Sequence, residues 1–275
     1  MTENNPIQTR PRDVTMSYFS TTCAFDFSID EFRVFLTLLR DLSTVFSGVD
    51  VRSRIQSSVA TRNLSARERR KEVVKLLRET IEEHGPDDEF RFIVNDDGSL
   101  RVEAYMNHYL ADNANHFDRV KDAMRGLNDK FIDVDDGKGN WARARLFEMP
   151  SIFRYEHAYF TVNPLLVEYF IDLSRGYRRF DYEIAFNFRS VYASRIYILL
   201  SGQTSSMPPI PIVRLKKIFG LEDKYKSDKD FIKRIIQSSQ REIELKAPFR
   251  FDYQIIKQRK EKSLKFTVKK KKAGT

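Results

Sequence analysis

Basic and amide side chains recur along one side of a stretch near the C-terminal end, and their types suit contact with nucleic acid. On a helix from 228 to about 245, at 100° per residue, Ile232, Ile236 and Ile243 fall on one side and the polar residues on the other. Lysine and arginine hold phosphates, and arginine and glutamine also read base edges. The candidate DNA-contacting residues of this helix are Lys229, Lys233, Arg234, Gln237 and Arg241.

A basic hairpin is predicted directly after this helix. Pro248 prevents the helix from continuing. From 249 to 255 and from 264 to 268, apolar residues alternate with polar ones, which is typical of two half-buried strands. The lysine-rich tip between them would neutralise phosphates in an adjacent groove of DNA. Its candidate contacts are Lys257, Arg259, Lys260 and Lys262.

The net charge is distributed unevenly along the chain. Residues 189–275 hold 22 Lys and Arg against 8 Asp and Glu, a balance of +14, whereas residues 1–188 hold 26 against 31, a balance of −5, and the two sum to +9. Such asymmetry favours a polyanionic partner for the basic half. A polar helix face and a basic tail are also compatible with plain solvation. The agreement of charge, helix and hairpin favours nucleic acid.

The elements before the long helix complete a helix-turn-helix order. Helices are predicted from 190 to 200 and from 212 to 219, the second ended by Gly220 in a left-handed cap, and Ser227 or Asp228 caps the long helix. In such a motif the second helix enters the major groove while the first braces it. The sequence therefore predicts a winged helix in the second half.

The first half is predicted to follow the same plan, with an insertion. Residues 1–22 are expected to be a flexible lead, and Ser28 with Glu31 forms a capping box for the first helix. Asn95 to Gly98 is a strong hairpin turn. The helix that starts at Ser65 has an apolar stripe but charges that oppose its dipole, so it is either a solvated inserted helix or an arm that touches DNA or another subunit. The predicted helices span 29–46, 65–84, 115–130 and 164–173, and the predicted strands span 90–94, 100–102, 131–134, 141–147 and 159–162.

Three segments of the second half carry a family resemblance. They read SVYASRIY from Ser190, VRLKKIFGL from Val213 and DFIKRII from Asp230, and the match continues through the two strands that follow. These segments resemble the second winged helix of iteron-binding plasmid replication initiators, closely over about 80 residues and loosely, by element order, over 25–188. The first half departs from the family pattern mainly through the insertion.

The resemblance implies an α+β fold of two tandem winged-helix domains with a pseudo-two-fold arrangement. The expected units are a lead at 1–22, an N-terminal domain at 23–188 with an insertion at 49–88, a C-terminal DNA-binding domain at 189–268, and a basic tail at 269–275. The implied partners are direct repeats in origin double-stranded DNA, the operator of the chain's own gene, a second copy in a monomer–dimer equilibrium, and the host initiator and helicase. Further DNA contacts, which plain surface charge explains equally well, are Lys121, Arg125, Arg143 and Arg145.

Enzymatic functions have little support in the residues. A rolling-circle initiator needs a His-x-His metal pair, but the four histidines, His84, His108, His116 and His157, are never two apart, and His108 and His116 are expected at the surface. The single Gly-Lys pair, at 137–138, lacks the preceding glycine of a P-loop. We therefore expect no catalysis, no metal and no cofactor.

Two other function classes remain open. A winged-helix transcription regulator without a replication role would use the same DNA chemistry, and a lone inverted repeat beside the gene would favour it. A nonspecific basic scaffold protein would lose its DNA at raised salt. The single cysteine, Cys23, and the lack of an apolar stretch long enough for a membrane span predict a cytoplasmic protein, which the resemblance places on a plasmid in a bacterial cell.

Overall fold

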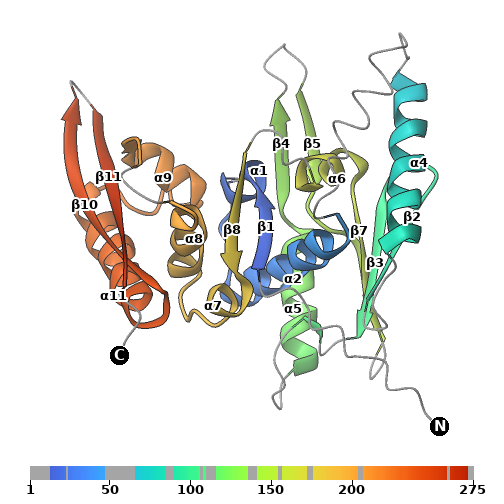
Figure 1. The fold of residues 1–275 in the computed structure, drawn as a ribbon, viewed down its shortest axis with the longest axis horizontal. Coiled ribbons are helices and arrows are strands. Elements are labelled where there is room, and N and C mark those ends of the chain that lie inside the picture. The colour runs from blue at the N-terminus through green and yellow to red at the C-terminus, as the bar shows by residue number, and fades with distance from the viewer. Residues whose placement is uncertain are drawn as a thin grey trace.

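The computed structural model places two groups of elements side by side (Figure 1). Between them lies a two-stranded sheet of β1 (Asp13–Ser17) and β8 (Tyr177–Asp181). The elements from α7 (Tyr182–Phe186) onward form one group, and those from α2 (Ile29–Phe46) to α6 (Pro164–Ile171) form the other. The structure describes residues 13–22, 24–46, 66–84, 90–105, 108–109, 116–135, 141–153, 157–171, 176–203, 207–258 and 261–271. The mixed helix-and-sheet content agrees with the predicted α+β class.

The N-terminal group is built around an antiparallel sheet in the order β2-β3-β7-β6. Helix α2 (Ile29–Phe46) is largely buried and contacts α5 (His116–Asn128), β1 and α6, with Val34, Phe35 and Leu36 fully buried. The capping box is confirmed, because the backbone N–H of Ser28 donates to Glu31 Oε2 at 2.6 Å and that of Glu31 to Ser28 Oγ at 3.2 Å. The strands are β2 (Phe90–Val94), β3 (Leu100–Tyr105), β6 (Glu148–Ile152) and β7 (His157–Val162).

Three further helices and a second hairpin follow the predicted order. Helix α4 (Ala66–His84) buries Val73, Val74 and Leu77, and Arg78 donates to the carbonyl of Val94 at 3.0 Å, so this inserted helix is packed against the end of β2. Helix α5 (His116–Asn128) leads into the β4–β5 hairpin, which has the position of a wing. The remaining elements are β4 (Phe131–Asp135), β5 (Trp141–Arg145) and α6 (Pro164–Ile171).

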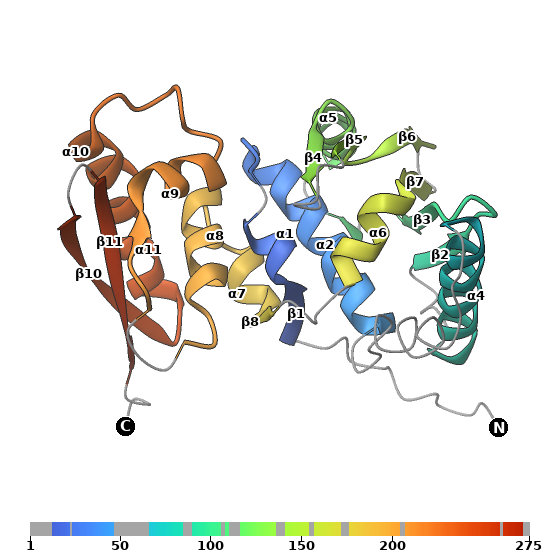
Figure 2. The same cartoon turned by 90° about the horizontal axis from the view of Figure 1, so that it is seen from above.

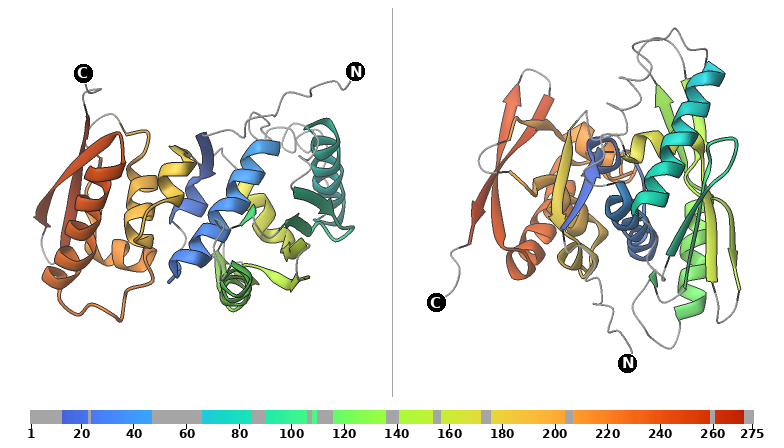
Figure 3. Two further views of the ribbon diagram at one scale, coloured as in Figure 1. Left: turned by 90° about the horizontal axis from the view of Figure 1, so that it is seen from below. Right: turned by 45° about the vertical axis from the view of Figure 1, so that its right-hand side comes forward.

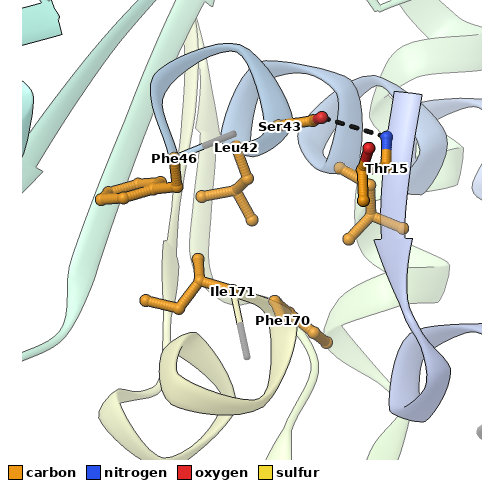
Figure 4. Close-up of a pocket in the computed structure, with 7 residues that line it drawn as sticks. Thr15, Leu42, Ser43, Phe46, Phe170 and Ile171 are labelled. Carbon is orange, nitrogen blue, oxygen red and sulfur yellow. Dashed lines mark hydrogen bonds between the residues drawn. The ribbon is translucent and has the colours of Figure 1, made fainter. Parts of the chain in front are cut away.

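The prediction that residues 1–22 form a flexible lead is wrong for residues 13–22. Strand β1 (Asp13–Ser17) pairs antiparallel with β8 (Tyr177–Asp181), and α1 (Tyr18–Thr22) follows it. Val14 and Met16 are buried, and the backbone N–H of Thr15 donates to Ser43 Oγ on α2 at 3.1 Å (Figure 4). The strand was missed because its partner lies about 165 residues away.

The C-terminal group stacks helices on a three-stranded sheet in the order β10-β11-β9. Helix α11 lies between the β10–β11 ribbon and α8 (Figure 3). The ribbon runs to Lys270, and Lys269 Nζ contacts Asp252 Oδ2 at 2.6 Å, so the predicted basic tail begins two residues later than expected. The elements are α7 (Tyr182–Phe186), α8 (Val191–Leu200), β9 (Ile210–Pro211), α9 (Ile212–Ile218), α10 (Asp228–Phe231), a π-helical turn (Ile232–Ile236), α11 (Gln237–Lys246), β10 (Phe249–Gln258) and β11 (Glu261–Lys270).

The two groups meet where α8 and α9 approach the segment that precedes α2 (Figure 2). The buried Arg195 of α8 donates to the carbonyl of Phe25 at 2.8 Å. Gly220, which ends α9 with φ +64°, lies so close to that segment that a Cβ would stand 2.5 Å from the backbone nitrogen of Asp26. The predicted left-handed cap is confirmed, and the same glycine also permits the close approach.

Candidate nucleic-acid interface

The predicted long helix is one continuous rod from Asp228 to Lys246. Ser227 caps its start by accepting from the backbone N–H of Asp230, and Pro248 follows its end. The apolar side lies in the core: Ile236 and Ile243 are fully buried. The side chains of Lys229, Lys233, Arg234, Gln237 and Arg241 are all exposed, as the periodicity predicts.

The middle of this rod is a π-helical turn, which the sequence pattern did not predict. The backbone N–H of Gln237 bonds to the carbonyl of Ile232, five residues earlier. Such turns occur mostly as single widened turns inside α-helices and frequently at functional sites. The widened turn itself contains Lys233 and Arg234, and it separates the N-terminal part of the helix, with Lys229, from the part that begins at Gln237.

The hairpin that follows is long and regular. Strands β10 and β11 pair from Phe249↔Lys270 to Gln258↔Glu261, and Lys257 faces Lys262 across the ladder near the tip. Both lysines are exposed. Arg259 and Lys260, which the sequence places at the tip, lie outside the described residues. Ile255, the last apolar residue of the stretch predicted as a half-buried strand, is 50% exposed, because the strand extends past the core before it turns.

A groove of about 440 Å³ separates the start of the rod from the hairpin. It brings together basic, acidic, amide and apolar side chains from both elements. Arg234 and Arg241 do not line it and lie on another part of the exposed helix surface. The lining residues are Asp228, Lys229, Ile232, Lys233, Gln237, Tyr253, Ile255, Lys257 and Lys262.

Side-chain contacts tie the rod to the hairpin along this groove. Gln237 Nε2 donates to the Tyr253 hydroxyl at 3.0 Å. Asp228 accepts from Lys216 Nζ of α9 at 2.9 Å and from Lys262 Nζ of β11 at 3.4 Å. The hydrogen bond from Lys216, together with both ammonium charges, lowers the pKa of the Asp228 carboxyl. These bonds couple the helix to the hairpin.

Two groove residues were missed as candidates from the sequence. Tyr253 belongs to the stretch 249–255, which was interpreted only as a half-buried strand. Asp228 was interpreted only as a possible cap. Its bond to Lys262 joins positions 34 residues apart, and no local pattern indicates such a pair.

Comparison with known families identifies both halves of the chain. The model described as "Initiator Replication protein, WH1" matches residues 54–201, and the one described as "Initiator Rep protein, WH2" matches residues 211–268. The chain belongs to the family of replication initiator Rep proteins. The fold is therefore two winged-helix Rep domains in tandem, as the resemblance implied.

A solved structure has the same fold as this Rep chain. It is described as "Crystal structure of Pi initiator protein in complex with iteron DNA" and matches with a TM-score of 0.58 and 10% sequence identity, over 94% of this chain and 98% of that one. At this identity the match establishes the fold alone. The search of curated proteins gave no match. None of the described helices is long and apolar enough to cross a membrane.

The N-terminal candidates of this Rep chain lie on other elements, well away from the groove (Figure 1). Arg143 and Arg145 are exposed on β5, and both guanidinium groups lie over the ring of Phe131, at 4.8 and 4.7 Å from its centroid. Lys121 and Arg125 are exposed on α5. The structure therefore puts all four at the surface, on the wing and on the helix before it, and their contact with DNA stays a prediction.

The histidine predicted at the surface beside the first hairpin is instead buried. His108 Nε2 lies 2.6 Å from Asp41 Oδ2, and Arg40 reaches the same nitrogen at 3.0 Å. The position was misjudged because the carboxylate that accommodates it comes from α2, 67 residues away.

Among the described residues no three His, Cys, Asp or Glu side chains form a group able to hold a metal ion. The cavity in Figure 4, of about 20 Å³, has room for about one water molecule.

Proposed function

We propose that this Rep chain is a plasmid replication initiator that binds direct repeats in origin double-stranded DNA and, as a dimer, represses its own promoter. The observation that carries the proposal is the groove, in which lysines and Gln237 of the long helix lie beside exposed lysines of the hairpin, while Arg234 and Arg241 are exposed elsewhere on the same helix. This is the arrangement in which a helix reads the major groove and a wing holds the backbone. Family membership and the fold shared with the Pi initiator, which was solved with iteron DNA, support it.

The DNA-contacting residues divide by role in this proposal. Arg234, Gln237 and Arg241 read bases or flank them, because they are exposed on the helix that enters the major groove. Lys229 and Lys233 hold phosphates at the groove. The lysines and the arginine of the hairpin hold phosphates of the DNA backbone beside the adjacent groove. The N-terminal wing and the helix before it add a second, weaker set of phosphate contacts. The phosphate-holding residues of these last two groups are Lys257, Arg259, Lys260, Lys262, Lys121, Arg125 and Arg143.

The proposal gives the two domains different roles. In the proposal residues 23–188 carry dimerisation and additional DNA contacts, with 49–88 as the insertion, and residues 189–268 form the main DNA-binding domain. The chain acts by binding and not by catalysis, in the cytoplasm of a bacterial cell. It recruits host replication proteins to the opened origin, and its monomers and dimers are in equilibrium.

Footprinting on the DNA that flanks the gene tests the proposal most directly. Protection at regularly spaced direct repeats, retained against unrelated competitor DNA at raised salt, is the expected result. Protection of a single inverted repeat would identify a transcription regulator instead, and loss of all protection in competitor DNA would identify a nonspecific basic protein. A small circle that bears the gene and its repeats should replicate autonomously, and failure in every plausible host would contradict initiation.

A further inference from the structure

Tyr253 occupies a particular place on strand β10, where the strand leaves the core. Along one face of the strand, exposure rises from Phe251, at 1%, through the half-buried Tyr253 to Ile255, at 50%. The Tyr253 ring packs at the edge of the core, and its strand partner is the buried Phe266. Its hydroxyl extends into the groove and meets the Gln237 amide. The tyrosine therefore joins the packed part of the domain to the exposed face of the helix.

The Gln237 amide retains its capacity to read a base while it makes this contact. A glutamine amide has two N–H donors and one oxygen acceptor. One donor is used by the Tyr253 hydroxyl, at 3.0 Å. The second N–H and Oε1 remain, and these are the two groups with which glutamine binds N7 and N6 of adenine in the major groove.

The contact also has an energetic consequence. An exposed glutamine has several rotamers of similar energy, and ordering such a side chain on binding costs free energy. A hydrogen bond to a ring that is itself held by the core selects one of those rotamers in advance. The neighbouring bond from Gln240 Nε2 to the carbonyl of Phe251, at 2.6 Å, holds the helix to the same strand one turn later. Two hydrogen bonds, from Gln237 and Gln240, therefore join the helix to the strand at this point.

We propose that Tyr253 is a specificity-determining positioning residue, which orients the Gln237 amide so that the protein reads an adenine in its DNA repeat. This inference rests on the proposed function, since it assumes that the helix from Asp228 to Lys246 enters the major groove. It assigns Tyr253 no contact with DNA of its own. The hydroxyl acts only through Gln237.

The test measures the affinity of the full chain for duplexes that carry the footprinted repeat and every single base-pair substitution of it. Gln237→Ala identifies the base pair that Gln237 reads, as the position at which the preference for adenine is lost. Tyr253→Phe keeps the ring and removes the hydroxyl. It should lower the preference for adenine at that same base pair by about 2- to 10-fold, the equivalent of one hydrogen bond, and leave the preferences elsewhere and the salt dependence unchanged. In the Gln237→Ala background it should have no further effect.

The control is Tyr192→Phe, which removes a hydroxyl from α8 of the same domain, away from the groove, and should bind every duplex as the unchanged chain does. Thermal unfolding of each variant checks that the fold is retained. An unchanged adenine preference in Tyr253→Phe overturns the inference, and so does an equal loss of affinity for all duplexes, which would mean that the hydroxyl contacts a phosphate. If the unchanged chain shows no base preference at all, the proposed function itself fails, so the two failures are distinguishable.

Discussion

Replacement of Arg234 by alanine should separate base reading from phosphate binding. The side chain is exposed, and no hydrogen bond or ion pair to it occurs among the described residues. Alanine is at least as good a helix former as arginine, so the free energy of unfolding should change by no more than about 0.5 kcal/mol. Any larger effect on DNA affinity must then come from the lost contact with DNA.

The expected loss follows from the contact that an arginine on a reading helix makes. A bidentate pair with a base edge discriminates by about 1–3 kcal/mol, which corresponds to about a 5- to 150-fold rise in Kd for the preferred repeat. The loss should be confined to duplexes with the preferred base at one position, so that the variant becomes indifferent there. The assay is a titration of labelled duplexes with each base pair substituted in turn.

Lys257→Ala is the matched comparison on the hairpin. Lys257 is exposed and lines the groove, and it is expected to hold a phosphate. Its loss should weaken binding to all duplexes alike and lower the slope of log K against log salt by about one. If both variants lose affinity uniformly, or if Lys257→Ala changes base preference while Arg234→Ala does not, the assignment of a reading helix and a phosphate-holding wing is refuted.

Three further predictions concern the framework of the interface. Gly220→Ala should lower the thermal unfolding midpoint. The left-handed conformation alone costs about 1–2 kcal/mol for a residue with a Cβ, and that Cβ would stand 2.5 Å from the backbone nitrogen of Asp26. An unchanged midpoint would contradict the close approach. Asp228→Asn should lower the free energy of unfolding of the domain at neutral pH, as measured by chemical denaturation. Because the pKa of Asp228 is lowered in the folded state, the difference in this free energy between the variant and the unchanged chain should shrink as pH falls below about 4. A difference that grows at acid pH would exclude the Lys216 and Lys262 contacts as its cause. Ser28→Ala should cost about 0.5–2 kcal/mol of unfolding free energy, measured by urea denaturation, by removing one half of the capping box.

The helices and their faces were predictable because local physics decides them. The recurrence of Ile232, Ile236 and Ile243 at spacings of four and seven residues defines the buried side of the long helix, and the capping box at Ser28 marks the start of α2 within one residue. The hairpin turn before Ser99 is likewise local, closed by the hydrogen bond from the backbone N–H of Asn95 to the carbonyl of Ser99 at 2.9 Å. In each case all the interacting residues lie within a few positions of one another.

The errors arose where the partner is distant in sequence. Strand β1 is a strand only because β8 pairs with it, and a five-residue segment by itself carries no sign of that partner. The buried state of His108 depends on Asp41 in the same way. At the candidate site, alternation placed Tyr253 on the correct face of β10, but it could not tell where along the strand the core ends, and that point decides whether the hydroxyl is buried or reaches Gln237.

The helix proposed to read DNA is held at several points along its length, and this bears on how the protein would discriminate between DNA sequences. Near its start Asp228 bonds to α9 and β11, in its second half Gln240 bonds to β10, and near its end Glu242 accepts from the backbone N–H of Arg189 at 2.6 Å, just before α8. A helix fixed in this way cannot tilt to accommodate a poorly matching site at low cost. Pre-organisation lowers the entropy lost on binding, and it also makes each mismatch leave a polar group without a partner instead of being relieved by movement. Discrimination should therefore arise chiefly from faster dissociation of mismatched duplexes, while association, governed by the exposed lysines, stays similar for all of them.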